Sequence, residues 1–329
     1  MASSVSFTVE SAVQDWPHRR HLYRIRVASL SSRESSHTGP IIKYLTLPKH
    51  YDAARPPAFP DHRGDLLAFD AVPAGDWNLG HLSIPADDSS NTKGKYILTL
   101  TERAPLDEAI GLRDAGPAWC NSNTKFDLTL LLDAFYAQRK NLQPADNNSY
   151  DDDDYPLTDI QCMGHLHAAV LPNPEDPNQP NPVIGVWAWE PDLYSAIATE
   201  SHVYSLIQTR DPGLAPRFLG HITDNGTRIV GFLLEQIGGA REAGLADMEA
   251  CRDALRRLHA LGITYGGSLR RHSFLVCRDG SVLLQGFGGA FETDDEAVLG
   301  REMNGLREVL AAASEMERVN RPRGSKAQL

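Results

Sequence analysis

The sequence lacks long apolar runs, basic runs and closely spaced cysteines. No stretch approaches the roughly 20 apolar residues of a membrane-spanning helix. With 43 acidic against 32 basic side chains the net charge is −11, and no run of five basic residues occurs. Nucleic acid and membrane are therefore not expected as partners. Four cysteines are present and show no C-x-x-C spacing, which argues against a zinc knuckle and a disulfide scaffold.

The cysteine usage fits a reducing compartment, and the N-terminal residues fit it too. The first twenty residues lack the apolar core of a secretory leader, and Glu10 and Asp15 are unlike a transit peptide. We therefore expect a cytoplasmic protein.

Two further absences concern charged side chains in the C-terminal half. Residues 254–278 contain no Asp, Asn or Glu, and residues 141–325 contain no lysine. Enzymes that transfer phosphate hold magnesium with such carboxylate or amide oxygens, and they bind the phosphates with a lysine. Because whole segments lack these residue types, no choice of alignment restores them.

The length of 329 residues allows two domains or one large one, and 41 % hydrophobic with 23 % charged residues is ordinary for a globular protein. Short strands joined by Pro- and Gly-rich turns are expected first. They are predicted at residues 6–10, 22–28, 41–47, 81–84 and 96–101. A helix is predicted over 124–140, followed by a polar, acidic linker over 141–154 that lacks the Gly and Glu of a calcium loop.

From residue 157 onward the pattern changes to longer strands and amphipathic helices. In the helix predicted over 192–209, Glu200 lies within the apolar stripe rather than opposite it. Strands are predicted at 157–164, 165–171, 183–189, 218–222 and 228–234, and as a short pair around a turn at 278–280. Further helices are predicted over 245–261 and 295–319.

Several segments together carry a resemblance to a known family. They are Pro73 to Gly80, Glu200 with Tyr204, Pro216 to His221, Gly231 to Glu235 and Leu258 to Thr264. On these residues the chain resembles the fungal protein-kinase-like proteins related to aminoglycoside phosphotransferases, over nearly its whole length. The resemblance implies an α+β, bilobal protein-kinase-like fold with a truncated C-lobe and a β-rich N-terminal extension. The implied parts are 1–150 for the extension, 155–238 for the N-lobe and 239–329 for the reduced C-lobe.

The resemblance also implies where the catalytic groups of a kinase would stand. The phosphate-binding lysine falls on Val186, and the metal-binding Asp of the D-F-G strand falls on Gly286. The catalytic Asp falls on Ser268 or Gly267, and the metal-binding Asn falls on Ser273. Gly164 is the single glycine in 157–171, so the glycine-rich loop is missing as well.

Other polar residues are still expected along the cleft that the resemblance implies. Candidate ligand-binding residues are Glu200, Glu235, Gln236, Ser268, Arg270, Arg271, Ser273 and Gln285, with His272 and Tyr265 as acid/base groups under an enzymatic alternative. Each of them has a simpler interpretation as a packed or loop-capping side chain. Arg270 or Arg271 is a possible replacement for the lysine beside Glu200.

Two other constellations are weaker. Cys162, His165 and His167 form C-x-x-H-x-H but lack a clear fourth ligand, and we expect no metal. Ser268 and Ser273 near His272 could suggest a nucleophile with its base, but no G-x-S-x-G elbow surrounds them.

These observations favour a pseudokinase that lacks phosphoryl transfer and binds a small molecule or a protein partner, with no cofactor. The alternative is a non-phosphotransfer enzyme of specialised metabolism, of cyclase or isomerase type, in which the former nucleotide cleft holds a small organic substrate. An active phosphotransferase with relocated ligands is the least favoured hypothesis.

Overall fold

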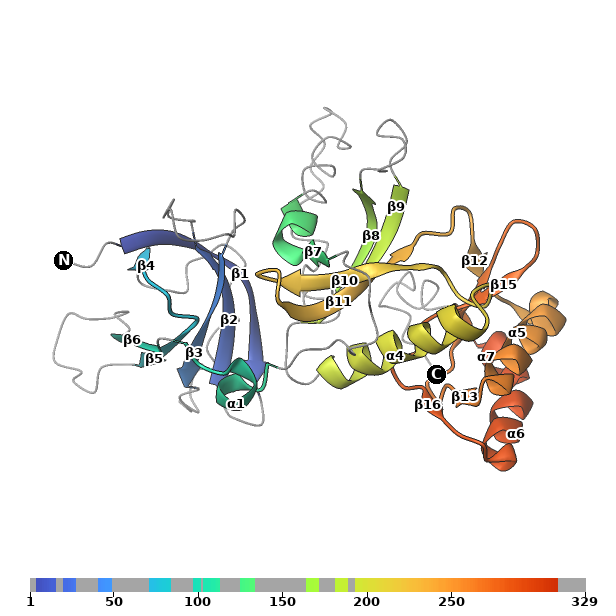
Figure 1. The fold of residues 1–329 in the computed structure, drawn as a ribbon. Coiled ribbons are helices and arrows are strands. Elements are labelled where there is room, and N and C mark those ends of the chain that lie inside the picture. Colours follow the sequence, from blue (N-terminus) through green and yellow to red (C-terminus); the bar gives the residue numbers. More distant parts are fainter. Residues whose placement is uncertain are drawn as a thin grey trace, which may run out of the picture.

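The computed structural model describes residues 4–15, 20–27, 41–48, 71–83, 97–101, 103–112, 125–133, 164–171, 181–188 and 193–312. The fold is mixed α/β. An N-terminal curled sheet is followed by a second sheet with one long helix beneath it, and then by a mainly helical C-terminal part with short strands (Figure 1). Among these residues no helix is long and apolar enough to cross a membrane.

The N-terminal sheet has six strands in the order β4-β1-β2-β3-β5-β6. Its strands are β1 (Ser4–Asp15), β2 (Arg20–Val27), β3 (Ile41–Pro48), β4 (Ala71–Pro73), β5 (Leu79–Ser83) and β6 (Ile97–Thr101), and the short helix α1 (Leu106–Ile110) follows. The five strands expected from the sequence all lie in this sheet. The predicted strand over 6–10 is longer in the structure, because β1 pairs with β2 as far as Asp15.

This sheet is buried on both faces along β2 and β3. Side chains alternate between the two faces of a strand. On β2, Tyr23 and Ile25 pack into the core of the N-terminal sheet, whereas Leu22 belongs to a second core that extends to the C-terminal helices. Tyr44 on β3 belongs to that second core as well. The N-terminal sheet is therefore packed against the rest of the molecule.

The second sheet has the order β7-β10-β11-β9-β8. Its strands are β7 (Lys125–Asp127), β8 (Gly164–Leu171), β9 (Asn181–Trp187), β10 (Phe218–Asp224) and β11 (Arg228–Glu235), with helix α4 (Tyr194–Arg210) between β9 and β10 in the sequence. Strands β8 to β11 and helix α4 follow one another in the order predicted from the sequence for the strands 165–171, 183–189, 218–222 and 228–234 and the helix 192–209. Residues 125–133, assigned by sequence to the N-terminal region, add β7 in parallel to β10.

The C-terminal part is built around helix α5. It contains β12 (Arg241–Glu242), the 3-10 turn η2 (Leu245–Asp247), α5 (Met248–Ala260), β13 (Ile263–Thr264), η3 (Arg271–Ser273), β14 (Phe274–Val276), β15 (Val282–Leu284), β16 (Phe291–Glu292), α6 (Glu296–Asn304) and α7 (Leu306–Ala311). Cys251, Leu255 and Leu258 form the buried stripe of α5 that its periodicity predicted. Gly262, with φ of 76°, follows its end and turns the chain into β13.

Two helix predictions were wrong in their bounds. The helix predicted over 124–140 begins at residue 128, because the chain before it pairs with β10 and the Asp127 carboxylate accepts the N–H groups of Thr129 and Leu130. The helix predicted over 295–319 is divided at Gly305 into α6 and α7, and residues beyond 312 lie outside the described part. The predicted linker over 141–154 and most of the strand over 157–164 lie outside it too.

Candidate functional site

Helix α4 carries Glu200, the acid that the sequence placed opposite a missing lysine. The backbone N–H groups of Gly286 and Phe287, in the segment after β15, lie close to its carboxylate. Burial raises the pKa of Glu200 to about 7, and the two nearby N–H groups oppose that rise only in part. Within the described part of the chain, no cationic side chain forms an ion pair with it. In the absence of a lysine, these two backbone amides are the groups that favour the charged form of the acid.

Three aromatic rings lie next to this carboxylate. Phe287 meets Tyr204 edge-on at 5.3 Å between ring centroids, and Tyr265 stacks on Phe287 at 5.2 Å. All three side chains are fully buried. Burial, together with the Glu200 charge, raises the pKa of both tyrosines well above the ordinary value. Tyr265 therefore stays protonated near neutral pH, and its hydroxyl donates to the carbonyl of Gln285 at 3.0 Å.

The hydroxyl of Tyr204 differs from that of Tyr265. It is buried, and among the described residues it has no hydrogen-bond partner. An unpaired buried hydroxyl costs free energy, so its surroundings are less well satisfied than the rest of this core.

The loop expected to hold catalytic groups is closed by hydrogen bonds within itself. Ser268 donates through Oγ to the Tyr265 carbonyl at 2.6 Å. Arg270 donates through Nη1 to the carbonyls of Gly267 and Leu269 at 2.9 and 2.8 Å. The Arg270 N–H in turn donates to the Oγ of the buried Ser273 at 3.2 Å. These polar groups are used to fix the loop.

The remaining candidates of this loop are also engaged with backbone. Arg271 donates through Nε to the Ala243 carbonyl and through Nη1 to the Ala312 carbonyl at 3.4 Å. Gln285 donates its side-chain amide to the His272 carbonyl at 2.8 Å and its N–H to the Ser273 carbonyl at 3.0 Å. The structure therefore brings the loop candidates together with Gln285, but both arginines contact carbonyls and not Glu200.

Glu235 and Gln236, expected along the cleft, have other contacts. The Glu235 carboxylate accepts from Arg217 Nε at 3.4 Å in an exposed pair, and its N–H donates to the Arg217 carbonyl at 2.9 Å. Gln236 Oε1 is buried and has no hydrogen-bond partner within the described residues. No hydrogen bond there joins these two residues to the 265–273 loop.

The sequence did not single out a partly buried His–Glu pair that supports this loop. His259 Nε2 on α5 lies 2.8 Å from Glu302 Oε2 on α6, and Glu302 Oε1 accepts the Tyr265 N–H at 2.9 Å. The one available signal was His259 itself, within the segment that carries the family resemblance. Its partner is 43 residues away in the chain and has no motif of its own.

Residues 73–80, another of the segments that carry the family resemblance, contact a buried lysine. Lys43 on β3 is buried, its ammonium donates to the carbonyls of Gly75, at 2.8 Å, and Trp77, and it lies 4.2 Å from the centroid of the Trp77 ring. Burial lowers the pKa of Lys43 to about 8, partly opposed by the charge of Asp76. Asp76 itself is exposed and pairs with Arg103 at the rim of a surface hollow.

The described residues hold no group of three or more His, Cys, Asp or Glu side chains that could bind a metal. Cys162 and the side chains of His165 and His167 lie outside what the structure describes, so that C-x-x-H-x-H prediction is untested.

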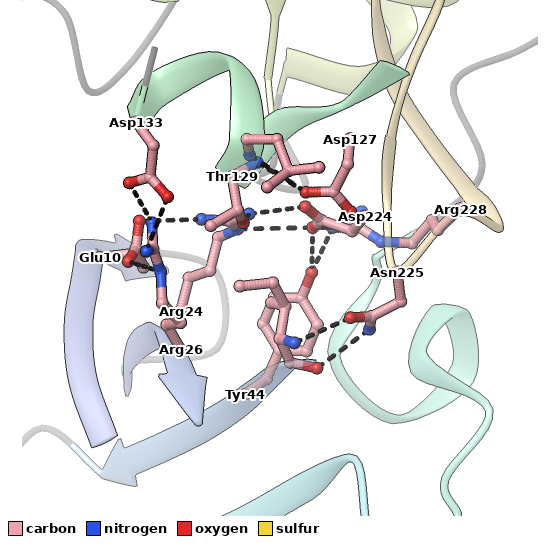
Figure 2. A network of polar contacts seen from close by, with 12 residues as sticks. Glu10, Arg24, Arg26, Tyr44, Asp127, Thr129, Asp133, Asp224, Asn225 and Arg228 are labelled. Atoms are coloured by element: carbon pink, nitrogen blue, oxygen red, sulfur yellow. Dashed lines mark hydrogen bonds and ion pairs between the residues drawn. The ribbon is translucent and has the colours of Figure 1, made fainter. Parts of the chain in front are cut away.

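A second polar centre lies where the N-terminal sheet meets the β10–β11 hairpin, at the end of β10 (Figure 2). The buried carboxylate of Asp224 accepts from Arg24 Nη2 at 2.7 Å, from the Tyr44 hydroxyl at 2.5 Å and from Arg228 Nη2 at 2.7 Å. Arg24 Nη2 also donates to Thr129 Oγ1 at 3.1 Å. One carboxylate therefore links strands β2, β3 and β11, and Arg24 extends the network to helix 128–133.

The turn residue after Asp224 completes this contact. Asn225 has φ of 52°, and its side-chain amide pairs with the backbone of Ile42 on β3, at 2.8 Å from the Ile42 N–H and 3.0 Å to the Ile42 carbonyl. The two strands that flank this turn were predicted from the sequence, but the contact of the turn with another sheet was not.

Electrostatics in this centre are those of a buried, balanced network. Burial alone would lower the pKa of Arg24, but the charge of Asp224 and its hydrogen bond raise it above the ordinary value. Burial also raises the pKa of Tyr44 well above the ordinary range. Both groups therefore keep one protonation state throughout the physiological range.

Comparisons with known proteins give little beyond the fold. No protein-family model and no curated protein matches the sequence. A solved structure matches 54 % of this chain and 75 % of its own chain, with 20 % identity and a TM-score of 0.30. It belongs to a divergent kinase that lacks the glycine-rich loop and regulates membrane ultrastructure of the Toxoplasma parasitophorous vacuole. The likeness is partial and kinase-like, and at this score it carries no argument. The fungal protein-kinase-like family stays a prediction.

Proposed function

We propose that this chain is a pseudokinase, a kinase-like body that binds a ligand or partner and transfers no phosphate. The observation that carries the proposal is the Glu200 carboxylate, which lies close to the N–H groups of Gly286 and Phe287 and has no ion-pair partner among the described residues. The positions expected for a lysine and for a magnesium-binding Asp are occupied by Val186 and Gly286, which can bind neither phosphate nor metal.

The size of the loss supports this reading. Metal, lysine and positioned acid supply most of the catalysis of phosphoryl transfer, with single groups worth factors of up to about 10³ to 10⁵. Residues 254–278 offer no Asp, Asn or Glu to replace them. The combined deficit leaves no useful transfer rate.

The contacts of the 265–273 loop favour binding over chemistry. Arg270 and Arg271 donate hydrogen bonds to backbone carbonyls, and Tyr265 is a buried core residue. A group that performs acid/base chemistry must reach the proton it moves. The enzymatic alternative, with a small organic substrate and Tyr265 or His272 as acid/base groups, therefore receives less support than a scaffold role.

Ligand-dependent stabilisation tests the proposal. A ligand that binds the native state stabilises it by RT ln(1 + [L]/Kd), about 2.7 kcal/mol at a hundredfold excess over Kd. With ATP present, we expect the same melting temperature in magnesium and in EDTA. A magnesium-dependent rise that Glu200→Gln removes would contradict the proposal.

Turnover tests the alternative separately. Incubation with candidate apolar metabolites should give stabilisation without product if the chain only binds. Product formation that His272→Ala abolishes at an unchanged melting temperature would establish an enzyme instead.

A further inference from the structure

The Arg228 side chain joins three elements that are distant in the sequence. It begins β11, and its guanidinium carbon lies 5.3 Å from the ring centroid of Tyr44 and 5.5 Å from that of Tyr194. Tyr44 belongs to β3 of the N-terminal sheet, and Tyr194 is the first residue of α4. Cation–π contacts of this kind gain strength when water is excluded.

The position of this guanidinium is fixed from several directions. Its Nη2 donates to the Asp224 carboxylate at 2.7 Å and to the Tyr44 hydroxyl at 2.5 Å. Asp224 is held in turn by Arg24, and only 2 % of the Asp224 and Arg24 side chains is exposed. In such a low-dielectric network each bond restrains the geometry of the next.

Helix α4 is anchored at three points along its length. Tyr194 contacts Arg228 at its start, Glu200 lies close to the amides of Gly286 and Phe287 in its middle, and Asp211 just after its end pairs with Arg257 of α5 at 2.7 Å. In Figure 1 the helix runs from the side of the N-terminal sheet to the C-terminal helices. Its first anchor alone involves the N-terminal sheet.

We infer that the N-terminal sheet positions helix α4, and with it the Glu200 carboxylate, through the contacts of Arg228 with Tyr44 and Tyr194. A helix of 17 residues is stiff, and Glu200 lies less than two turns from its first residue. A shift of the first turn therefore moves Glu200 as well. The inference does not depend on the proposed pseudokinase role, because it concerns how the acid is placed and not what it binds.

Amide exchange in the full-length chain tests the inference. Tyr44→Phe removes the hydroxyl that bonds Asp224 and Arg228, and Arg228→Gln removes the guanidinium between the two rings. We expect amide exchange in the first half of α4 to become roughly tenfold faster in both variants. The amide proton shifts of Gly286 and Phe287, which report the position of the nearby Glu200 carboxylate, should move in the same variants.

The exposed Arg26–Asp133 pair provides the matched control. It joins the N-terminal sheet to helix 128–133 at 2.8 Å without touching α4. Asp133→Asn should leave both readouts unchanged. If Arg228→Gln fails to fold, Tyr194→Leu releases the helix end while the Asp224 network stays intact. Normal exchange in α4 and unmoved Gly286 and Phe287 shifts in Tyr44→Phe and Tyr194→Leu would overturn the inference.

Discussion

The Glu200 carboxylate is an acid kept in a kinase-like position without its cation. A partly buried carboxylate without a cation is costly to ionise, which is why its pKa rises from 4.5 to about 7. Because the folded-state pKa is the higher one, the native state binds the proton more tightly than the unfolded chain. The contribution of Glu200 to stability is therefore complete below pH 4.5 and is lost as the pH rises through 7.

Glu200→Gln should make the protein more stable at alkaline pH. Glutamine can still accept an N–H bond from Gly286 or Phe287 and never ionises. Relative to wild type, the free energy of unfolding of the variant should rise by about 2 kcal/mol between pH 5 and pH 8, from the size of the pKa shift. Urea unfolding at the two pH values measures this change.

Glu235→Gln, which removes an exposed carboxylate paired with Arg217, is the matched control for the loss of one negative charge. If Glu200→Gln were equally destabilised at pH 5 and pH 8, the ionisation of Glu200 would not contribute to the pH dependence of stability.

At the residue scale, the most informative feature of the sequence was the absence of certain charged side chains. The absence of acids over 254–278 and of lysine over 141–325 needed no structure. The actual partners of Glu200 could not be predicted, since they are backbone N–H groups that any residue supplies. The carbonyl partners of Arg270 and Arg271 could not be predicted either, because every residue has a backbone carbonyl.

The β10–β11 hairpin turn illustrates how one element serves a distant one. Asn225 must adopt a left-handed conformation, with φ of 52°, and its amide must bond the backbone of Ile42. Asparagine meets both requirements, because its side chain tolerates that conformation and offers one donor and one acceptor.

Two substitutions separate these requirements. Asn225→Gly keeps the backbone conformation and loses the two hydrogen bonds, and should cost about 1–3 kcal/mol of stability. Asn225→Ala loses both, and should cost roughly 1 kcal/mol more than the glycine variant. Chemical denaturation of the two proteins measures the difference. Equal stability of the glycine variant and wild type would show that the bonds to Ile42 contribute nothing.

At the element scale, turn residues and periodicity predicted most strands and the α4 and α5 helices. The strand β7 was missed because its pairing with β10 is parallel and joins residues about 96 apart, from His221 to Lys125. The division of the last helix at Gly305 was missed because a helical apolar pattern continues across it.

The largest hydrophobic core among the described residues extends from the N-terminal sheet to the C-terminal helices. Leu22, Ile42 and Leu79 of the N-terminal sheet belong to the same buried cluster as Leu255 of α5 and Leu310 of α7. The Asp224 network lies where the two sheets meet, so the boundary is sealed by both apolar and polar contacts. Breaking one partner of such a buried pair leaves an uncompensated charge, which is strongly destabilising.

The sequence did not predict this docking. It divided the chain into an N-terminal region and two lobes, a division the structure leaves untested. Arg24, the residue that joins the N-terminal sheet to Asp224, lies within a strand. The alternation of side chains along a strand predicts only that one face is buried and the other is exposed to solvent. A buried arginine on the second face becomes understandable only when the Asp224 carboxylate, 200 residues away, is in place.

A shared core predicts that the N-terminal sheet and the C-terminal helices unfold together. In differential scanning calorimetry we expect one transition whose calorimetric and van't Hoff enthalpies agree. Leu82→Ala, in the separate small core of the N-terminal sheet, removes a side chain that is 1 % exposed and should cost about 2–5 kcal/mol. Because the units are coupled, this variant should shift the whole transition downward. A transition that splits in two, with the second at the wild-type temperature, would show that the N-terminal sheet melts independently.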